Sequence, residues 1–407
     1  MPSSAKPLVL VVTSTLPRWE DDTEPRFVLD LCQALASRYR VLVLAPHCLG
    51  AADRDHWQGV EVRRFRYFAQ WGEVLAYEGG ILPKLRRSPW LWLLVPIFFA
   101  ALVVAIARVL RRERPVLVHA HWLIPQGLAV CYARGFANRT VPLICTAHGA
   151  DVFGLRGRFA RALQRWVARR CERVGAVSEA LREELVRRGV DPRRISLLPM
   201  GVAVPDAPTA VGERDSHLIA FAGRLVEKKG VDLLLDAFGR LAREDPQARL
   251  CIAGGGPGLE RYRQQAAALG LGERAQFLGP VPQQRVRELF SLAAVAVMPS
   301  VTARDGDAEG LGLVMLEAMA TGCPVVVTDL PAVRGVVRPG ENALVFPERD
   351  GAALTEALRR LLKDRALAAR LGARGRLDVE ARFSWSAVGA EHATAYTEVL
   401  AVAGASA

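Results

Sequence analysis

The sequence lacks the cysteine spacing of a disulfide scaffold or a zinc ribbon. Its seven cysteines, at positions 32, 48, 131, 145, 171, 251 and 323, form no Cys-x-x-Cys pair, and an odd number leaves one without a partner. Small secreted folds and structural zinc sites depend on paired or closely spaced cysteines. A disulfide framework and a structural zinc ion are therefore not expected, and a reducing cytosol is favoured.

Three further patterns are scarce. Residues 1–15 contain one basic residue, Lys6, and run directly into an apolar strand-like stretch, so no secretion signal is expected. No low-complexity tract interrupts the chain. Charged strand surfaces with interleaved aromatic residues, typical of single-strand nucleic-acid binding, are also missing. We therefore expect no nucleic-acid partner.

Positive charge is present in excess, but only in one half of the chain. The net charge is +12, and residues 1–205 hold 30 Lys and Arg against 17 Asp and Glu. A basic half-molecule suggests an anionic partner such as membrane lipid or a phosphate-bearing acceptor. Arginine enrichment from a GC-rich genome explains the same excess without any partner.

The chain alternates short apolar runs with longer amphipathic stretches. A polar segment at 203–216 interrupts this rhythm, which then resumes. At 407 residues the chain exceeds the size of a single hydrophobic core, so two domains are expected. The alternation predicts an α/β fold with two Rossmann-like parallel-sheet domains that face each other across a cleft. The expected strands are 8–12, 41–44, 116–119, 143–146, 218–221, 249–253, 275–278, 295–299 and 324–328.

Residues 89–107 carry no charge and are long enough to span a bilayer. A span would place residues 1–88 and the strand at 116–119 on opposite sides of the membrane, although both are expected to belong to one sheet. Pro96 also predicts a break or bend. A buried core helix and an interfacial membrane anchor flanked by arginines are the other two interpretations.

Two carboxylates surround a glycine-bearing helix start at Glu309–Glu317. Gly310 and Gly312 let a ligand approach the backbone, and the N–H groups of an opening helix form a phosphate site. Glu317, about two turns further on, could accept hydrogen bonds from ribose, and Glu309 could do the same for a sugar. An amphipathic helix behind an acidic loop is the simpler alternative.

A second candidate site element is a basic turn that follows the strand at 218–221. Arg224 and Lys229 leave the same strand-to-helix turn, where two cations could clamp a diphosphate. Carboxyl ends of parallel strands lie at one edge of a sheet, so this turn and Glu309–Glu317 are expected to meet.

These motifs together resemble a known family. Gly-Arg-Leu-x-x-x-Lys-Gly at 223–230, Ala-Gly-Gly-Gly-Pro at 253–257, Phe-Leu-Gly at 277–279, Glu309 with Glu317, and Phe-Ser-Trp at 383–385 occur in order. The chain resembles the retaining glycosyltransferases of family four, whose GT-B fold has two Rossmann-like domains. The resemblance implies an acceptor-side domain at 1–205, a nucleotide-sugar domain at 206–385, and a C-terminal helix within 386–407 that crosses back to the first domain.

The resemblance also implies a set of site residues. Thr-x-His-Gly-x-Asp at 146–151 matches the element whose histidine reaches the donor sugar. The catalytic set would be His148, Arg224, Lys229 and Glu309. Donor binding would use Gly223, Arg224, Lys229, Gly279, Val281, Glu309, Gly310, Leu311, Gly312, Leu313 and Glu317. Arg18, Arg26 and Asp151 would lie on the acceptor side.

Other motifs are discounted. Asp305 and Asp307 imitate a D-x-D metal site of another fold, and Gly254–Gly256 is a weak dinucleotide motif without its acidic partner. His119 and His121 could ligate a metal, but alternate strand residues are taken to point to opposite faces and no third ligand is evident. No metal and no cofactor are therefore expected.

The sequence departs from the family in two loops. Residues 13–27 lack the glycine pair that many relatives carry after the first strand, and Leu330–Gly335 replaces the family's Gly-Gly-x-x-Glu stretch. Acceptor contacts in the first loop, and the glutamate contact in the second, cannot be carried over.

The expected activity is retaining transfer of a sugar from a nucleotide-diphosphate donor, a UDP-sugar before a GDP-sugar, to an acceptor hydroxyl. The acceptor is expected to be a lipid-linked saccharide or glycolipid of bacterial polysaccharide or envelope synthesis. The protein is expected in the cytoplasm, or bound to an anionic membrane surface on the inner face of the plasma membrane. A nonhydrolysing sugar-nucleotide 2-epimerase and a non-catalytic nucleotide-sugar or anionic-surface binder are the alternatives.

Overall fold

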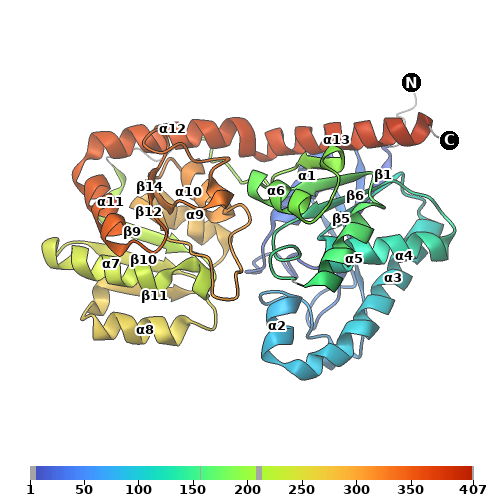
Figure 1. Cartoon of the computed structure of the whole chain (residues 1–407), viewed down its shortest axis with the longest axis horizontal. Helices are drawn as coiled ribbons and strands as arrows, with labels where there is room; N and C mark the ends of the chain where they lie inside the picture. The colour runs from blue at the N-terminus through green and yellow to red at the C-terminus, as the bar shows by residue number, and fades with distance from the viewer. Residues whose placement is uncertain (1–5, 156, 208–212, 406–407) are drawn as a thin grey trace. The chain divides into compact units, whose positions relative to one another are not determined.

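The computed structural model describes residues 6–155, 157–207 and 213–405 (Figure 1). The chain forms two compact units. Unit 1 comprises Met1–Gly201 and Val388–Ala407, and unit 2 comprises Val202–Ala387. Within the polar segment expected at 203–216, residues 208–212 lie outside the described part of the chain.

Unit 1 is built on an eight-stranded sheet in the order β3-β4-β2-β1-β5-β6-β7-β8. All neighbours are parallel except β3 and β4. Every residue of β1 is buried, as expected for an apolar strand covered on both faces. The strands are β1 Leu8–Val12, β2 Arg40–Pro46, β3 Arg54–Trp57, β4 Val60–Phe65, β5 Leu117–His121, β6 Leu143–Ala147, β7 Arg173–Ala176 and β8 Ile195–Leu197.

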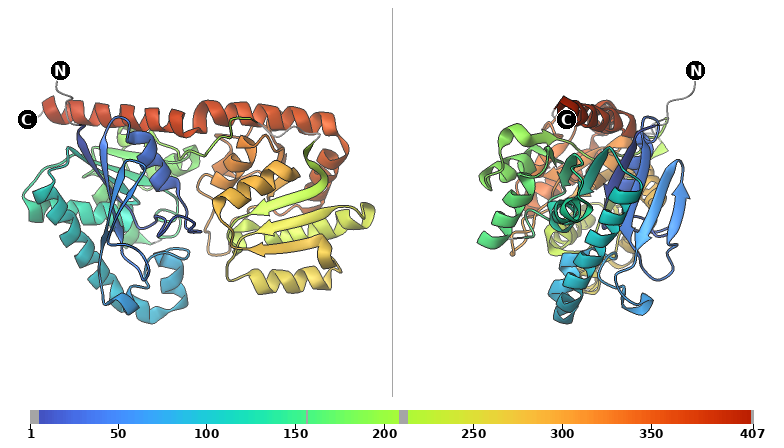
Figure 2. Two further views of the ribbon diagram at one scale, coloured as in Figure 1. Left: turned by 180° about the vertical axis from the view of Figure 1, so that it is seen from behind. Right: turned by 90° about the vertical axis from the view of Figure 1, so that its right-hand side faces the viewer.

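The helices of unit 1 surround this sheet (Figures 1 and 2). They are α1 Phe27–Leu35, α2 Ile81–Arg87, α3 Leu94–Arg112, α4 Leu128–Ala137, α5 Arg158–Ala168 and α6 Glu179–Arg187. The last helix, α13 Trp385–Ala405, starts in unit 2 and contributes its residues from Val388 onward to unit 1. It packs closely there, since a Cβ on Gly389 would lie 2.9 Å from the Cβ of Ala34.

The apolar segment 89–107 forms a short 3₁₀ turn, Pro89–Leu93, and the first part of α3. Pro96 lies in the first turn of α3, where its missing N–H costs no helical hydrogen bond. One face of α3 is buried through residues such as Phe98, Leu102 and Ile106. By length and composition Pro89–Arg112 could cross a membrane, with 44% of its apolar window buried. However, β1 pairs directly with β5, so the chain before and after α3 forms one sheet.

Unit 2 contains a six-stranded, fully parallel sheet in the order β11-β10-β9-β12-β13-β14. Its strands are β9 Asp215–Ala222, β10 Arg249–Ala253, β11 Ala275–Gly279, β12 Ala293–Met298, β13 Val325–Thr328 and β14 Leu344–Phe346. Its helices are α7 Val231–Glu244, α8 Leu259–Ala268, α9 Gln283–Leu292, α10 Leu313–Ala320, α11 Gly351–Lys363 and α12 Arg365–Phe383. The two Rossmann-like parallel sheets confirm the predicted fold class.

The direction of winding reverses once in each sheet. In unit 1 the strand order changes direction between β1 and β5, and in unit 2 between β9 and β12. Loops that leave the carboxyl ends of such strands diverge, which creates room for a ligand. The fold therefore places the loops after β9 and β12 at the ligand-binding edge of unit 2.

Backbone contacts hold the loop after β9 in place. Gly223 N–H donates to Ala253 O at 2.9 Å, and Leu225 N–H donates to Gly255 O at 2.9 Å. Gly254 has a φ of +142°, and a Cβ there would lie 1.9 Å from Gly223 O. The glycine run at 254–256 is thus needed for close backbone packing.

We predict that Gly254→Ala destabilises unit 2 because its new Cβ would collide with the backbone of Gly223. Gly270→Ala is a matched control, since Gly270 has a φ of +67° with open space around its Cβ position. The free energy of unfolding should fall by about 2 kcal/mol more for Gly254→Ala than for Gly270→Ala in denaturant titrations. Equal losses of unfolding free energy in the two variants would show that the positive φ angle, and not the collision with Gly223, causes the destabilisation.

Candidate functional site

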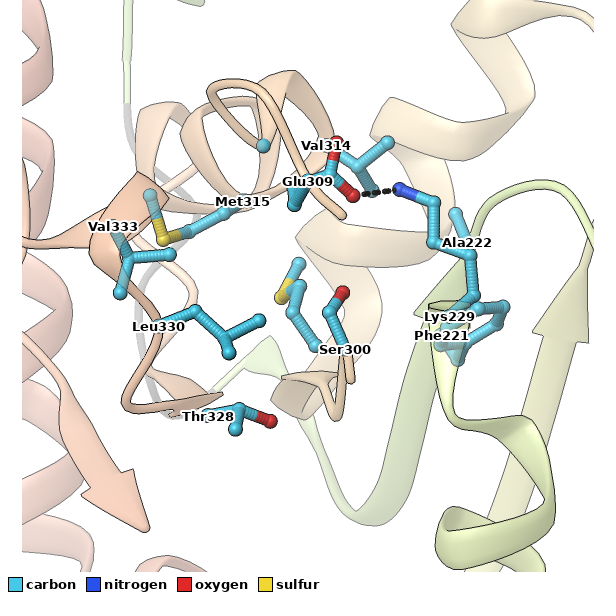
Figure 3. A pocket seen from close by; sticks show the side chains of 12 residues that line it. Phe221, Ala222, Lys229, Ser300, Glu309, Val314, Met315, Thr328, Leu330 and Val333 are labelled. Carbon is cyan, nitrogen blue, oxygen red and sulfur yellow. Dashed lines mark hydrogen bonds and ion pairs between the residues drawn. The ribbon is translucent and has the colours of Figure 1, made fainter. Parts of the chain in front are cut away.

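Lys229 and Glu309 meet at the switch point of unit 2 (Figure 3). Lys229 ends the 3₁₀ turn after β9, and Glu309 lies in the loop after β12, 80 residues along the chain. Lys229 Nζ lies 2.5 Å from Glu309 Oε2, and each side chain is 17% exposed. A largely shielded ion pair therefore joins the two predicted site elements.

The ion pair keeps Glu309 ionised. Burial alone would raise the pKa of Glu309, but the positive charges of Lys229 and Lys228 oppose it. Hydrogen bonds from Lys229 and the Gly310 amide act in the same direction, and together they lower the pKa to about 2. Glu309 is therefore a carboxylate that accepts hydrogen bonds at neutral pH, and it holds no proton to donate.

Helix α10 begins directly beside this pair. Gly312 is the N-cap residue of α10 and has the left-handed conformation, with φ +79°. Because glycine has no side chain, the first N–H groups of α10 receive no side-chain cap. The first N–H groups of a helix have no intrahelical acceptor and favour an anion. The predicted residues Gly310, Leu311, Gly312 and Leu313 thus form the loop and first turn next to Lys229.

A pocket opens at the same edge of unit 2. Figure 3 shows the Lys229–Glu309 pair on one wall, with the apolar side chains of Met315, Leu330 and Val333 on the other side. The remaining lining residues come from the ends of β9, β12 and β13 and the start of α10: Phe221, Ala222, Met298, Ser300, Gly312, Val314 and Thr328.

Glu317 has a partner that the motif does not contain. Gln283 Nε2 donates to Glu317 Oε1 at 2.6 Å, and Gln283 is the first residue of α9. The predicted residue Gly279 ends β11, and Val281 lies in the short connection before α9, so Gln283 links this connection to Glu317. Sequence reasoning missed Gln283; its place at the start of a helix directly after that turn is the available signal.

Arg224 and Gly223 lie on the same turn as Lys229. Arg224 is exposed, and it is not among the residues that line the pocket. The structure thus brings Lys229 to Glu309 and Gln283 to Glu317, and leaves Arg224 at the surface of the turn. Asp307, part of the discounted D-x-D sequence, pairs with Lys228 at 3.1 Å.

His148 and Asp151 follow β6 in unit 1. Asp151 is 3% exposed, and its carboxylate accepts the backbone N–H groups of Leu123 at 2.8 Å, His148 at 3.1 Å and Gly149 at 3.2 Å. Burial raises the pKa of Asp151 to about 6, although these hydrogen bonds oppose the shift. The carboxylate of Asp151 therefore holds the loop that carries His148.

His148 belongs to a cluster of imidazoles. The rings of His119 and His121 lie 4.4 Å apart, and His121 stacks on His148 at 5.1 Å. The statement that His119 and His121 point to opposite faces is wrong, because residues two apart in a strand share a face. In the described part of the chain no group of three or more metal-ligating side chains has a geometry that could hold a metal ion.

Helix α13 completes the cluster. Tyr396 OH lies 2.7 Å from His119 Nδ1, and the ring of His392 lies 6.0 Å from that of His119. Burial lowers the pKa of His392 to about 4 and that of His148 to about 3, and it places the pKa values of His119 and His121 well below their ordinary range. The four imidazoles are therefore neutral at pH 7.

The predicted acceptor-side arginines already have carboxylate partners. Arg18 forms two hydrogen bonds of 2.8 Å to the two carboxylate oxygens of Asp22 and stacks 4.4 Å from the Trp19 ring. Arg26 lies 3.4 Å from Asp30. An anionic acceptor would therefore have to compete with these carboxylates for either guanidinium.

The chain shares the GT-B fold with several solved glycosyltransferase structures. The chain superimposes on sucrose-phosphate synthase from Thermosynechococcus elongatus with a TM-score of 0.78 and 23% identity, over 98% of this chain and 100% of that one. Anabaena HepE in complex with UDP and glucose gives a TM-score of 0.72 and 18% identity, over 96% and 99% of the two chains. At these identities the likeness establishes the fold.

Sequence comparisons establish the family. Residues 25–204 match glycosyltransferase family 4, and residues 209–378 match the glycosyl transferases group 1. A GDP-mannose-dependent alpha-(1-6)-phosphatidylinositol monomannoside mannosyltransferase from Mycolicibacterium smegmatis is 32% identical over 61% of this chain and 68% of that protein. A D-inositol 3-phosphate glycosyltransferase from Geodermatophilus obscurus is 34% identical over 69% and 66% of the two chains. The chain belongs to the group 1 glycosyltransferases.

The imidazole cluster predicts a loss of stability in acid. An unfolded histidine binds a proton near pH 6.5, whereas folded His392 resists protonation down to about pH 4, so acid favours the unfolded state. Between pH 7 and pH 5, His392 alone should account for about 2 kcal/mol of lost stability. Asp151 acts in the opposite sense, because its raised pKa favours the folded state as the pH falls.

His392→Leu should therefore lose about 2 kcal/mol less stability than the wild type between pH 7 and pH 5. Denaturant unfolding followed by tryptophan fluorescence measures this in unit 1, where all tryptophans except Trp385 lie. The same acid-induced loss in both proteins would mean that His392 is already protonated in the folded state.

Proposed function

We propose that this protein is a retaining, metal-independent glycosyltransferase that uses a nucleotide-diphosphate sugar. The observation that carries the proposal is the shielded Lys229–Glu309 pair beside the uncapped start of α10. A cation and a row of backbone N–H groups suit a diphosphate, and an ionised carboxylate suits sugar hydroxyls. Family membership supports the same class of reaction.

Different residues of unit 2 would bind different parts of the donor. Lys229, Arg224 and the amides of Gly310–Leu313 would stabilise the charge that develops on the diphosphate as the sugar–phosphate bond breaks. Glu317, held by Gln283, would accept hydrogen bonds from ribose. Glu309 would hold hydroxyls of the transferred sugar, and the turn with Gly279 and Val281 would contact the base.

His148 belongs to unit 1, and its role is a separate part of the proposal. We assign it a hydrogen bond to the transferred sugar. Because its imidazole is neutral at pH 7, it would act as a polar contact and would not carry positive charge to the site. The acceptor hydroxyl would attack from the face that the leaving phosphate vacates, and that phosphate would take the hydroxyl proton.

The acceptor we propose is a lipid-linked saccharide or glycolipid. One relative is named for a phosphatidylinositol mannoside acceptor, and another for inositol 3-phosphate. The donor base is open between uridine and guanosine, since the first relative is named for GDP-mannose and HepE was solved with UDP-glucose. A panel of UDP- and GDP-sugars therefore belongs in every assay.

We predict that nucleotide release from the active donor persists with EDTA present and falls at least about 100-fold in Lys229→Ala. Removal of the lysine takes away the cation that meets the diphosphate. Glu309→Gln, which keeps the size but loses the charge, should fall by a similar factor. The measurement is release of UDP or GDP in the presence of candidate acceptors.

Lys363→Ala is the matched control, because Lys363 is an exposed lysine in the last turn of α11 in the same unit. Its rate should stay close to that of the wild type. Full activity in Lys229→Ala and Glu309→Gln would overturn the donor assignment. Conversion of the donor to an epimer without any acceptor would instead identify a sugar-nucleotide epimerase.

We also propose that unit 1 binds an anionic membrane surface from the cytoplasmic side. The surface, called the α3 stripe, consists of Leu93 at the N-cap of α3 and of Ile97, Ala100 and Val104 within the helix, all exposed at helical spacing. Trp90 and Trp92, 61% and 56% exposed, stand at the start of the stripe. Tryptophan is favoured at the level of lipid headgroups.

Basic residues flank the α3 stripe at both ends. Arg87 is exposed in the last turn of α2, and Arg108, Arg111 and Arg112 are exposed in the last turns of α3. Pro89–Arg112 contains no Asp or Glu. An apolar row with arginines at each end suits a helix that lies in the headgroup region of an anionic bilayer.

The double variant Trp90→Ala/Trp92→Ala should lower binding to vesicles that contain anionic lipid about tenfold, with its thermal midpoint unchanged. Trp57→Ala in β3 serves as a control for the loss of a tryptophan away from the stripe. Vesicle sedimentation at low and high salt, with neutral vesicles and DNA for comparison, measures the effect. Wild-type binding that is equal for neutral and anionic vesicles, or absent, would overturn the membrane proposal.

A further inference from the structure

His121 is a buried residue that no motif assigns to the site. It is the last residue of β5 and is fully buried. Its Nδ1 lies 2.9 Å from Nε2 of His148. The centroid of its ring lies 4.4 Å from that of His119 and 5.1 Å from that of His148. Its orientation toward His148 is therefore fixed by packing.

The bond between the two imidazoles contains a single proton. Either His121 carries it on Nδ1 and donates, or His148 carries it on Nε2 and donates. A neutral imidazole has one further ring nitrogen, which then has the opposite role. The two arrangements therefore differ in what each residue presents at its remaining nitrogen.

Nε2 of His121 distinguishes the two arrangements. This atom is buried and has no hydrogen-bond partner among the described residues. If His148 donated, His121 would have to bury an N–H group there without a protein acceptor. If His121 donates, only a lone pair is left there, and buried orphan N–H groups are the rarer and costlier case.

We propose that His121 is a positioning residue that fixes His148 as the tautomer protonated on Nδ1. His148 then presents a neutral N–H donor to an oxygen of the transferred sugar. This inference rests on the proposed role of His148 in the glycosyltransferase reaction. Phe27 and Trp122 pack against the imidazole of His148, with ring centroids 5.2 Å and 4.8 Å from its own.

The surrounding groups support the neutral form. Burial is the main cause that lowers the pKa of His148 to about 3, and the nearby His119 and His392 act in the same direction. His119 does not compete for His148, because its two nitrogens bond to Tyr396 OH at 2.7 Å and Thr146 Oγ1 at 2.8 Å. Among the described contacts, the hydrogen bond to His121 is therefore the one that determines the tautomer of His148.

The tautomer can be observed directly. The full chain, labelled with ¹⁵N in its seven histidines, gives long-range ¹H–¹⁵N spectra in which protonated and unprotonated ring nitrogens separate. His148→Gln identifies the signals of His148. We expect a protonated Nδ1 and an unprotonated Nε2 at pH 7. A proton on Nε2 of His148 in the wild type would overturn the inference.

Two substitutions of His121 test its donor function. His121→Asn places an amide N–H near the position of Nδ1 and should keep the His148 tautomer, with kcat within about threefold of wild type. His121→Leu removes the donor. It should mix the tautomers and lower kcat at least about tenfold while the KM of the donor sugar stays within about twofold. Equal kcat values for both variants and the wild type would count against a positioning role.

His119→Leu is the matched control, since His119 is equally buried two residues away and makes no hydrogen bond to His148. It should lower the thermal midpoint and leave the His148 tautomer unchanged. A tautomer change as large as in His121→Leu would assign the effect to the whole cluster and overturn the inference. If the protein turns over no sugar donor, the proposed function fails, while the spectra still decide whether His121 fixes the tautomer.

Discussion

The ion pair between Lys229 and Glu309 ties together two loops that leave different strands of unit 2. Without it, each side chain would be a largely shielded charge without its partner, which is costly at any pH where Glu309 is ionised. The loops are also held by the backbone, since Val301 N–H donates to Lys228 O at 2.8 Å and Gly230 allows Pro299 O to approach. The charged groups are therefore presented on a rigid frame, so a donor that binds them meets groups that need little rearrangement.

The two units use opposite electrostatic solutions. In unit 2, ionised side chains of opposite charge lie near the start of α10 and form ion pairs with each other. In unit 1 the groups packed around His148 are instead the neutral, buried imidazoles of His119, His121 and His392. A neutral polar group costs less free energy to bury than a charge does. This difference explains why the predicted acid sensitivity arises in unit 1.

Apolar runs predicted interior strands of both sheets, such as Leu8–Val12 and Leu250–Ala253, because strands buried on both faces have continuous apolar sequences. The expected strands did not include β3, β4, β7, β8 and β14, which lie toward the edges of the two sheets. The contact of Lys229 with Glu309 also followed from strand ends that share an edge. The partners of site residues did not follow. Gln283 reaches Glu317 from another helix. The imidazole cluster also needs α13, whose Tyr396 lies 277 residues along the chain from its hydrogen-bond partner His119. Arg18 was expected on the acceptor side, and its bond to Asp22 was not predicted because it depends on the conformation of the loop after β1.

Helix α13 has a consequence for how the protein is made. Its Tyr396 bonds to His119 and its Gly389 lies against Ala34, so unit 1 contains residues that are synthesised after all of unit 2. The strands of unit 1 precede unit 2 in the chain, whereas the hydrogen-bond partner of His119 follows it. Unit 1 therefore cannot make all its native contacts until the whole of unit 2 has been synthesised.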